Sequence, residues 1–215
     1  MRVRSPVPVR TISAIKADQD RDDILRAAFR LVGALRDQPV SVQQILEAAN
    51  LSTRAFYRHF RSKDELIITM YRTAAERVAV ELAEVVAAAP GPVEALRAYI
   101  HHHLAVVYEV RRARQTSVLN SSEARAAAGF DRATEDDAAH RRELLAAVIA
   151  DGRRSGVFSS ATDPQEDARA VISVVGGLIQ ARIAGHDVPT WEAATEHVTA
   201  LFLRSFGASS VTATD

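Results

Sequence analysis

Cysteine is absent from all 215 residues of the chain, and this absence excludes several kinds of site. Without thiols there can be no disulfide framework, no thiolate nucleophile and no Cys-ligated zinc or iron–sulfur centre. Only 9 residues are glycine, and runs of alternating Val, Ile and Thr between tight turns are missing, so β-strands have almost no support. Alanine, the best helix former, supplies 39 residues, which favours a nearly all-helical protein.

Long apolar runs are also missing. The stretch Val78–Ala89 is broken by Glu81 and Glu84, and it falls far short of the ~20 apolar residues that a membrane-spanning helix requires. The basic segment Met1–Lys16 is interrupted by two prolines and offers no apolar stretch typical of a secretion signal. We therefore expect a cytoplasmic protein.

Charge is balanced over the whole chain but not within it. The 27 basic and 27 acidic residues cancel. Residues 1–72, however, carry 13 Lys and Arg against 8 Asp and Glu, a net charge of +5, and residues 73–215 carry 14 against 19, a net charge of −5. Such polarity between the two parts of a chain indicates a nucleic-acid-binding module joined to a module of different function.

Residues that can cap helices divide the chain into about nine predicted helices. Segments 41–44 and 62–65 fit the reciprocal Ser-x-x-Gln/Glu capping box, and Pro92 and Pro164 can each occupy a first helical position. Asp20 is a further candidate cap. Helices are expected over residues 21–36, 41–48, 52–59, 62–88, 92–112, 114–127, 134–155, 163–185 and 191–206.

The segment 41–60 fits a helix-turn-helix unit, because two short predicted helices are joined by a turn of the right length. Asn50 can adopt the left-handed conformation that ends the first helix. Ser52 can then cap the second helix. Phe56 and Phe60 are four residues apart on that helix, so we expect both to point into a small core.

The opposite face of the second helix carries groups that suit DNA. The N-terminal turn of such a helix enters the major groove, where Arg54 can pair with guanine and Thr53 can contact a base edge or a phosphate. An ordinary solvated helix face would look similar, and the interpretation depends on the caps and the turn that accompany it. The other candidate DNA-binding residues are Ser41, Ser52, Tyr57, Arg58, His59 and Lys63. Of these, Tyr57, His59 and Lys63 suit phosphate oxygens.

Several motifs between residues 20 and 72 carry a family resemblance. They are Ile24-Leu25-Arg26-Ala27-Ala28-Phe29, Ser41-Val42-Gln43-Gln44-Ile45 and, most specifically, Phe56-Tyr57-x-His59-Phe60-x-Ser62-Lys63-x-Glu65-Leu66. In these motifs the chain resembles the DNA-binding domain of the TetR family of transcriptional regulators. The resemblance implies a homodimer in which Thr53 and Arg54 face bases, while Tyr57, His59 and Lys63 face phosphates.

The sequence departs from the family pattern at three places. Asn50-Leu51 stands where Gly-Val is usual, Ala55-Phe56 stands where Thr-Leu is usual, and Asp37-Gln38-Pro39 replaces a glycine-bearing turn. These departures preserve the predicted fold and leave the operator sequence open.

Apolar positions on the last two predicted helices indicate a dimer interface, since two amphipathic helices can form a four-helix bundle with their two-fold mates. The pair Gly176-Gly177 lies within one of these helices, where each glycine costs roughly 1 kcal/mol relative to alanine. A close approach across the dimer, a kink beside a ligand and simple tolerance all remain possible reasons. The interface candidates are Val171, Val174, Val175, Gly176, Leu178, Val198, Leu201 and Phe202.

The resemblance also implies an inducer cavity among the middle helices. The segment Ser121–Asp137 contains Gly129 and many small or charged residues, and we expect it to be a movable entrance. The candidate lining residues, each equally compatible with ordinary core, are Tyr99, His103, Val106, Val107, Leu119, Phe130, Leu145 and Ile149. His101-His102-His103 lacks the i, i+3 or i, i+4 spacing that would bring two ligands together on a helix. Neither a metal nor another cofactor is predicted.

Four regions follow from these patterns. They are a mobile basic arm at 1–19, which could lie along DNA or be an ordinary leader, a helix-turn-helix domain at 20–72, a ligand-binding and dimerisation domain at 73–206, and a flexible tail at 207–215. The function that fits is a homodimeric repressor released from a palindromic operator by a small, mainly apolar ligand. A constitutive DNA-binding dimer without inducer is the alternative. An enzyme is not predicted, because no catalytic spacing rises above chance.

Overall fold

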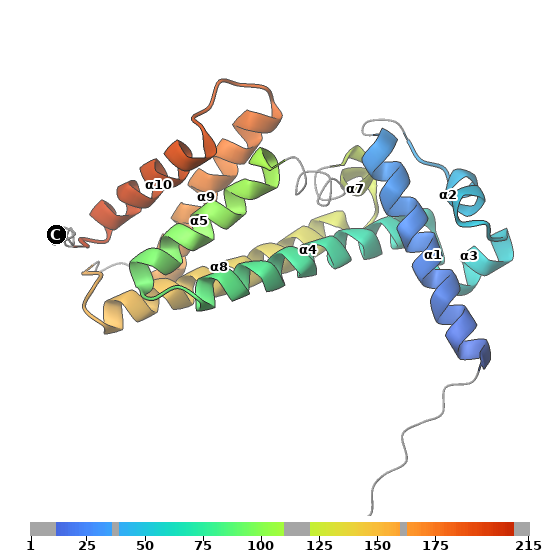
Figure 1. Ribbon diagram of the computed structural model, residues 1–215, viewed down its shortest axis with the longest axis horizontal. Helices are drawn as coiled ribbons and strands as arrows, with labels where there is room; N and C mark the ends of the chain where they lie inside the picture. The colour runs from blue at the N-terminus through green and yellow to red at the C-terminus, as the bar shows by residue number, and fades with distance from the viewer. Residues whose placement is uncertain (1–11, 36–38, 110–120, 160–162, 209–215) are drawn as a thin grey trace, which may run out of the picture.

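A computed structural model of the chain describes residues 12–35, 39–109, 121–159 and 163–208, and within these ranges it contains helices and turns but no strand (Figure 1). The predicted all-α class is confirmed. The helices are α1 (Ile12–Leu35), α2 (Val42–Ala49), α3 (Thr53–His59), α4 (Lys63–Ala87), α5 (Pro92–Tyr108), α7 (Ser122–Ala126), α8 (Phe130–Arg154), α9 (Pro164–Ile183) and α10 (Trp191–Ser205). None of the described helices is both long enough and apolar enough to cross a membrane.

Most predicted helix starts are correct, and the reasons given for them hold. Ser41 and Gln44 form the complete capping box, and Pro92 and Pro164 occupy the first turns of α5 and α9. At the start of α4, Ser62 caps the amide of Glu65, but the Glu65 carboxylate accepts from the amide of Arg61 at 2.6 Å instead of closing the box on Ser62.

Two predicted helix starts are wrong, and a third predicted helix is only partly described. Helix α1 begins at Ile12 and not at residue 21, because Asp20 is buried inside the helix instead of capping it. Residues 12–19 are therefore helical, and the remainder of the predicted arm lies outside the described residues. Helix α8 begins at Phe130 and not at residue 134, directly after Gly129 in the left-handed conformation (φ 93°). A helix is expected over residues 114–127. Residues 114–120 are not described, and the described remainder contains α7.

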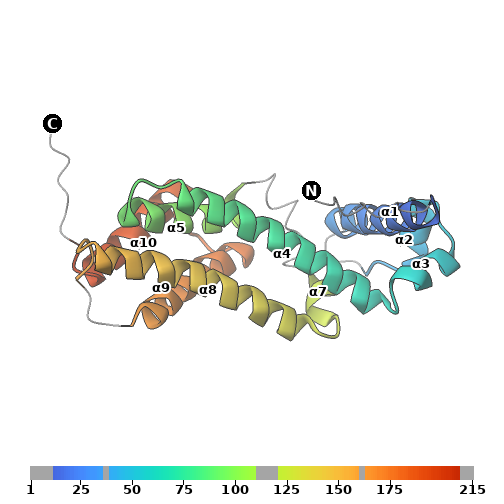
Figure 2. The same ribbon diagram turned by 90° about the horizontal axis from the view of Figure 1, so that it is seen from below.

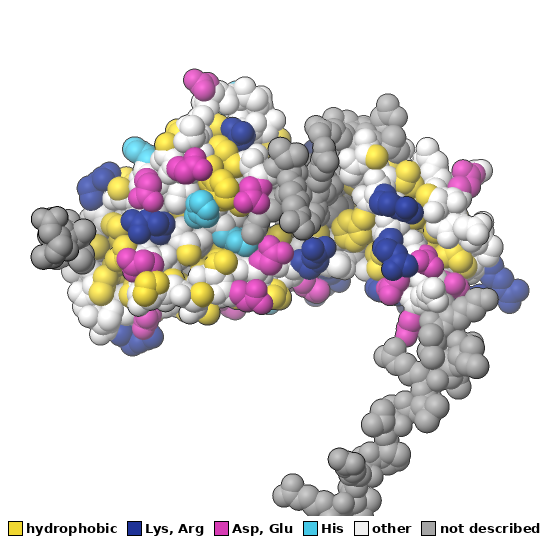
Figure 3. Space-filling view, viewed as in Figure 1, with side chains coloured by type: hydrophobic (Ala, Val, Ile, Leu, Met, Phe, Trp, Pro, Cys, Tyr) yellow, Lys and Arg dark blue, Asp and Glu magenta, His cyan; other side chains and the backbone are white. Residues whose placement is uncertain are grey.

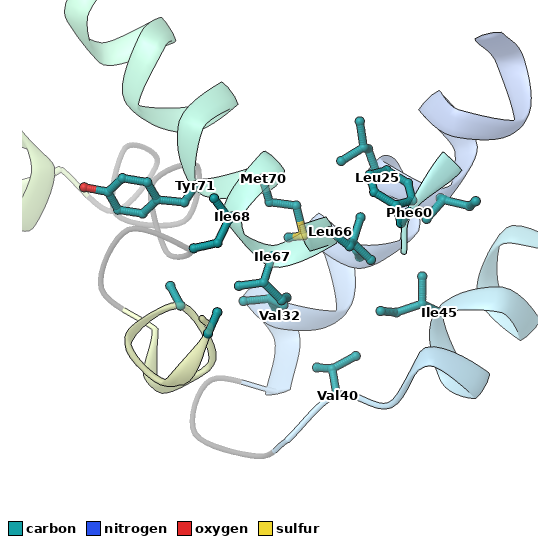
Figure 4. Close-up of a cluster of buried hydrophobic side chains, with 14 of the residues drawn as sticks. Leu25, Val32, Val40, Ile45, Phe60, Leu66, Ile67, Ile68, Met70 and Tyr71 are labelled. Carbon is teal, nitrogen blue, oxygen red and sulfur yellow. The ribbon is translucent and has the colours of Figure 1, made fainter. Parts of the chain in front are cut away.

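Two hydrophobic cores organise the molecule, and α4 belongs to both. The first core joins α1, α2, α3 and the beginning of α4, which supplies Leu66, Ile67 and Met70 (Figure 4). The second core joins α5, α8, α9 and α10 to the end of α4, which supplies Leu82 and Val86. Helix α8 packs along α4 (Figure 2). One continuous helix therefore connects the part that carries α2 and α3 to the larger helical part.

Helix α7 adds a second connection between the two parts. The Glu123 carboxylate accepts a hydrogen bond from the backbone amide of Val40 at 2.7 Å and pairs with the Lys63 ammonium group at 2.7 Å. Nearby, the Asp64 carboxylate accepts from the amide of Ala128 at 3.3 Å. Ala124 is buried in the first core. The segment around α7 is thus held against the helix-turn-helix unit by both apolar and charged contacts.

We predict a measurable coupling between Lys63 and Glu123. In a double-mutant cycle of Lys63→Met and Glu123→Gln, the coupling free energy of unfolding should be about 0.2–1 kcal/mol at low salt and smaller at high salt. Glu123→Gln keeps an oxygen that can accept from Val40, so Glu123→Ala should destabilise the protein more. Denaturant titration measures these values, and zero coupling would show that the ion pair contributes nothing.

Candidate nucleic-acid interface

The connection between α2 and α3 has the geometry of a helix-turn-helix. Asn50 adopts the predicted left-handed conformation (φ 54°, ψ 45°), and its amide donates to carbonyl oxygens of the last turn of α2. The next amide, that of Leu51, donates to the Leu46 carbonyl at 3.0 Å. Ser52 then accepts from the amide of Ala55 at 3.3 Å and caps α3. These local contacts fix the direction in which α3 leaves the turn.

Burial separates the two faces of α3 as the sequence predicts. Phe56 has an exposed fraction of 0% and lies 5.7 Å from Phe60, ring centre to ring centre, in the first core. On the other face Thr53 and Arg54 are exposed, and Tyr57 has an exposed fraction of 62%. No described part of the chain covers this face, so it is available to a partner.

A groove of about 830 Å³ lies between α2 and α3. Thr53 and Tyr57 form one wall, as expected from the sequence, whereas Arg54 is exposed but does not line the groove. The complete lining is Val42, Gln43, Leu46, Glu47, Asn50, Leu51, Ser52, Thr53 and Tyr57. The sequence interpretation missed Gln43 and Glu47. The sequence pattern could have indicated both residues, since they lie four residues apart on the face of α2 opposite the buried Ile45.

Several predicted phosphate ligands already contact the protein's own chain. The Arg58 guanidinium pairs with Asp20 of α1 at 3.3 Å, and Lys63 pairs with Glu123 as described above. The Nε2 atom of His59 is buried and has no partner among the described residues. Basic and acidic side chains are interspersed at the end of the molecule formed by α1, α2 and α3 (Figure 3). Tyr57 is thus more accessible to a phosphate than either His59 or Lys63.

Those predicted inducer contacts that lie in the described part of the chain do not form one cluster. Tyr99, Leu145 and Ile149 are buried in the second core, and His103 stacks on Tyr99 with ring centres 5.7 Å apart. Val106 and Val107 are half-buried near the end of α5, and Leu119 lies outside the described residues. Phe130 packs in the first core, where it contacts Tyr71 edge to face at 5.3 Å.

The predicted entrance is occupied by ordered structure. The segment from Ser121 to Asp137 contains α7 and the first turns of α8. Ala124 and Ala133 of this segment are buried in the first core. The small residues that suggested a movable loop therefore serve close packing of α7 and α8 against α4.

A buried polar cluster lies where α4, α5 and α8 meet. Asp137 pairs with Arg141 at 2.6 Å, and its carboxylate charge acts on the nearby Tyr71 hydroxyl. Tyr71 lies at the edge of the first core, turned away from Met70 (Figure 4). Burial, reinforced by the Asp137 charge, raises the pKa of Tyr71 to about 12. The same desolvation raises the pKa of Tyr99 and that of Asp137 above their usual ranges.

His103 is the most perturbed member of this group. Burial, with smaller contributions from Arg141 and His102, lowers the pKa of His103 to about 3. Its Nδ1 atom is buried without a partner among the described residues. The side chain is therefore a neutral imidazole at physiological pH. Its neighbour His101 instead stacks on Trp191 with ring centres 4.0 Å apart, and the described residues include no group of three possible metal ligands.

The predicted dimer residues divide into two groups by their burial within the chain. Val171, Val175, Val198 and Phe202 are buried in the chain's own second core. Val174 and Leu201 point outward, with exposed fractions of 37% and 40%. Leu178 is half-buried. A methyl group added to Gly176 or Gly177 would meet open space within this chain, so packing inside the monomer does not explain the glycine pair.

The depressed pKa of His103 predicts acid sensitivity with a definite sign. Below its ordinary pKa of 6.5 the unfolded chain takes up a proton that folded His103, with a pKa of about 3, does not bind. Stability is therefore lost as the pH falls from 6.5 towards 3, by at most about 1.4 kcal/mol per pH unit. His103→Gln should flatten this slope in denaturant titrations, while the exposed control His186→Gln should not. Equal slopes in both variants would contradict the assignment.

Comparison with known proteins agrees with this geometry. Residues 24–70 match the family model of the bacterial regulatory proteins, tetR family. The HTH-type transcriptional regulator TcmR of Streptomyces glaucescens is 39% identical over 54 residues, which are 25% of this chain and 24% of that protein. The chain therefore matches only about a quarter of the length of this curated relative.

Solved structures extend the likeness in fold to most of the chain. The regulator FadR of Bacillus subtilis, in complex with stearoyl-CoA, has a TM-score of 0.70 at 14% identity, over 86% of this chain and 98% of that one. AibR, in complex with isovaleryl coenzyme A and operator DNA, has a TM-score of 0.63 at 16% identity, over 88% and 100% of the two chains. Residues 24–70 therefore match the model of the bacterial regulatory proteins, tetR family, and the chain shares the fold of FadR and AibR.

Proposed function

We propose that the protein is a homodimeric repressor that binds a near-palindromic operator and is released from it by a small, mainly apolar ligand. The observation that carries the proposal is the uncovered face of α3, where Thr53, Arg54 and Tyr57 are exposed above the buried Phe56. A helix presented in this way fits the major groove. Binding DNA in a bacterial cell also implies the cytoplasm, as expected from the sequence.

The proposed DNA contacts follow the exposed groups. Thr53 and Arg54 read base edges, and Tyr57 binds a phosphate with support from the amides at the start of α2, beside Ser41. Ser52 caps α3 and holds its first turn in place. Arg58 and Lys63 reach phosphates only where their ion pairs within the chain open on binding, and His59 only where its buried Nε2 atom becomes exposed.

The proposed dimer uses the outer faces of α9 and α10. Val174 and Leu201 are exposed apolar side chains there, and Gly176 offers open space in which a partner backbone could approach. A two-fold axis between such helix pairs gives an isologous interface. It also sets the distance between the two copies of α3, which should be about 34–36 Å for half-sites one helical turn apart.

The proposed inducer binds beside Tyr99 and His103, among α4, α5 and α8. Two proteins of this fold were solved with acyl-CoA ligands, FadR with stearoyl-CoA and AibR with isovaleryl coenzyme A. A ligand that separates α8 from α4 would move the first core through α4 and α7 and so change the distance between the recognition helices. The coupling arises because the ligand binds one arrangement better than the other.

A second candidate function is a constitutive DNA-binding dimer without inducer. The close packing of Tyr99, Leu145 and Ile149 in the second core favours it. Thermal unfolding in the presence of cell-extract metabolites separates the two candidates, because an inducer that binds the folded state raises the melting temperature.

A randomised-site selection with the full chain tests the operator-binding role. The wild-type protein should enrich an inverted repeat, and Arg54→Ala should lose about 1–3 kcal/mol of discrimination at one position in each half-site. Tyr57→Ala should weaken binding to all sequences alike. Arg169→Ala, a change to an exposed arginine of α9, is the matched control. Failure of the wild-type protein to enrich any site would refute the proposed function.

Sedimentation analysis tests the dimer. Leu201→Glu places a charge on an exposed position of α10 and should convert the dimer to a monomer without unfolding it, because a buried unpaired charge is costly only in the assembled state. The control is Val80→Glu, which changes a more exposed valine of α4 outside this face. A monomeric wild-type protein, or a dimer that tolerates Leu201→Glu, would rule out this interface.

A further inference from the structure

Two polar side chains of α2 form the wall of the groove opposite Thr53 and Tyr57. Gln43 and Glu47 both line the groove and are both exposed. They lie one helical turn apart and touch each other, since the Gln43 amide is 3.0 Å from the Glu47 carboxylate. If α3 enters the major groove of DNA, these two side chains meet the same stretch of duplex.

The contact between them fixes the orientation of the Gln43 amide. A carboxylate can only accept hydrogen bonds, so the nitrogen of the amide, Nε2, must face Oε1 of Glu47. One N–H of Gln43 is used in this bond. The second N–H and the amide oxygen remain available, and an amide offers in these two groups the donor and acceptor that bind N7 and the amino group of adenine in the major groove.

The negative charge of Glu47 lowers the affinity of the protein for DNA of any sequence. The described residues give this carboxylate no cationic partner, and its hydrogen bond comes from a neutral amide. An uncompensated negative charge on a surface that approaches phosphates weakens binding to every sequence. A residue that lowers non-specific affinity while it orients a base-reading group raises the ratio of specific to non-specific binding.

We infer that Gln43 reads an adenine in each half-site and that Glu47 is the positioning residue that holds it for this contact. The inference rests on the proposed operator-binding function. It assigns base recognition to α2 in addition to α3.

Randomised-site selection with the full chain tests the inference. The wild-type protein should prefer adenine at one position of each half-site, and Gln43→Ala should lose this preference by about 5- to 150-fold while leaving the other positions unchanged. Glu47→Ala should weaken the preference at the same position. Glu47→Gln should retain most of it, because its amide oxygen can still accept from Gln43. The matched control is Glu143→Ala, a change to an exposed glutamate of α8.

A second readout separates positioning from charge. On a scrambled duplex at low salt, Glu47→Ala and Glu47→Gln should both bind about fivefold more tightly than the wild-type protein, and the gain should fade as salt is added. Only Glu47→Ala should also relax the choice of base. A purely electrostatic role would make the two variants alike in both measurements and would overturn the positioning role.

The remaining outcomes are also decisive. If the wild-type protein enriches a palindrome and Gln43→Ala enriches the same palindrome with the same base preferences, the inference is wrong and the proposed function stands. If Gln43→Ala loses the preference for a base other than adenine, the assigned pairing between Gln43 and adenine is wrong. If the wild-type protein enriches no site, the proposed function fails and the inference fails with it.

Discussion

The burial of one face of α3 is the constraint on which the rest of the site depends. Phe56 and Phe60 occupy the first core together with side chains of α1 and α4, and a helix of only seven residues depends on this packing, in addition to the turn contacts before it, to hold its orientation. Because these two rings are fixed, Arg54, roughly half a turn from Phe56, must face outward. The exposure of Arg54 is thus a consequence of core packing, while Thr53 is exposed at the first position of α3 and Tyr57 about a quarter turn from Phe56.

Features determined by neighbouring residues could be predicted from the sequence. The Ser41 capping box, the left-handed Asn50 and the Ser52 cap each depend on groups within a few positions, so local rules suffice. The same is true of the inward position of Phe56. The helical class followed in the same way from alanine content and missing turn signals.

Features determined by distant residues could not be predicted. Asp20 looked like a cap because nothing near it in the sequence reveals Arg58, its partner 38 residues away. Glu123 lies 83 residues from Val40, and no local signal connects them. Apolar positions on α9 and α10 were ambiguous for a related reason. Periodicity shows that a helix has an apolar face, but it does not show whether Val171 or Val174 meets the chain's own core.

The contacts of α7 limit how far the two halves of the molecule can be treated as interchangeable parts. Joining residues 12–72 to the helical half of another regulator would replace the second part of α4 and remove Glu123, leaving the amide of Val40 and the ammonium group of Lys63 without their acceptor. Recombination between such regulators would therefore tend to succeed when the exchanged piece carries the α7 segment along with the helix-turn-helix. In this chain, the residues that must be exchanged together form two separate stretches of sequence, the helix-turn-helix domain and the α7 segment.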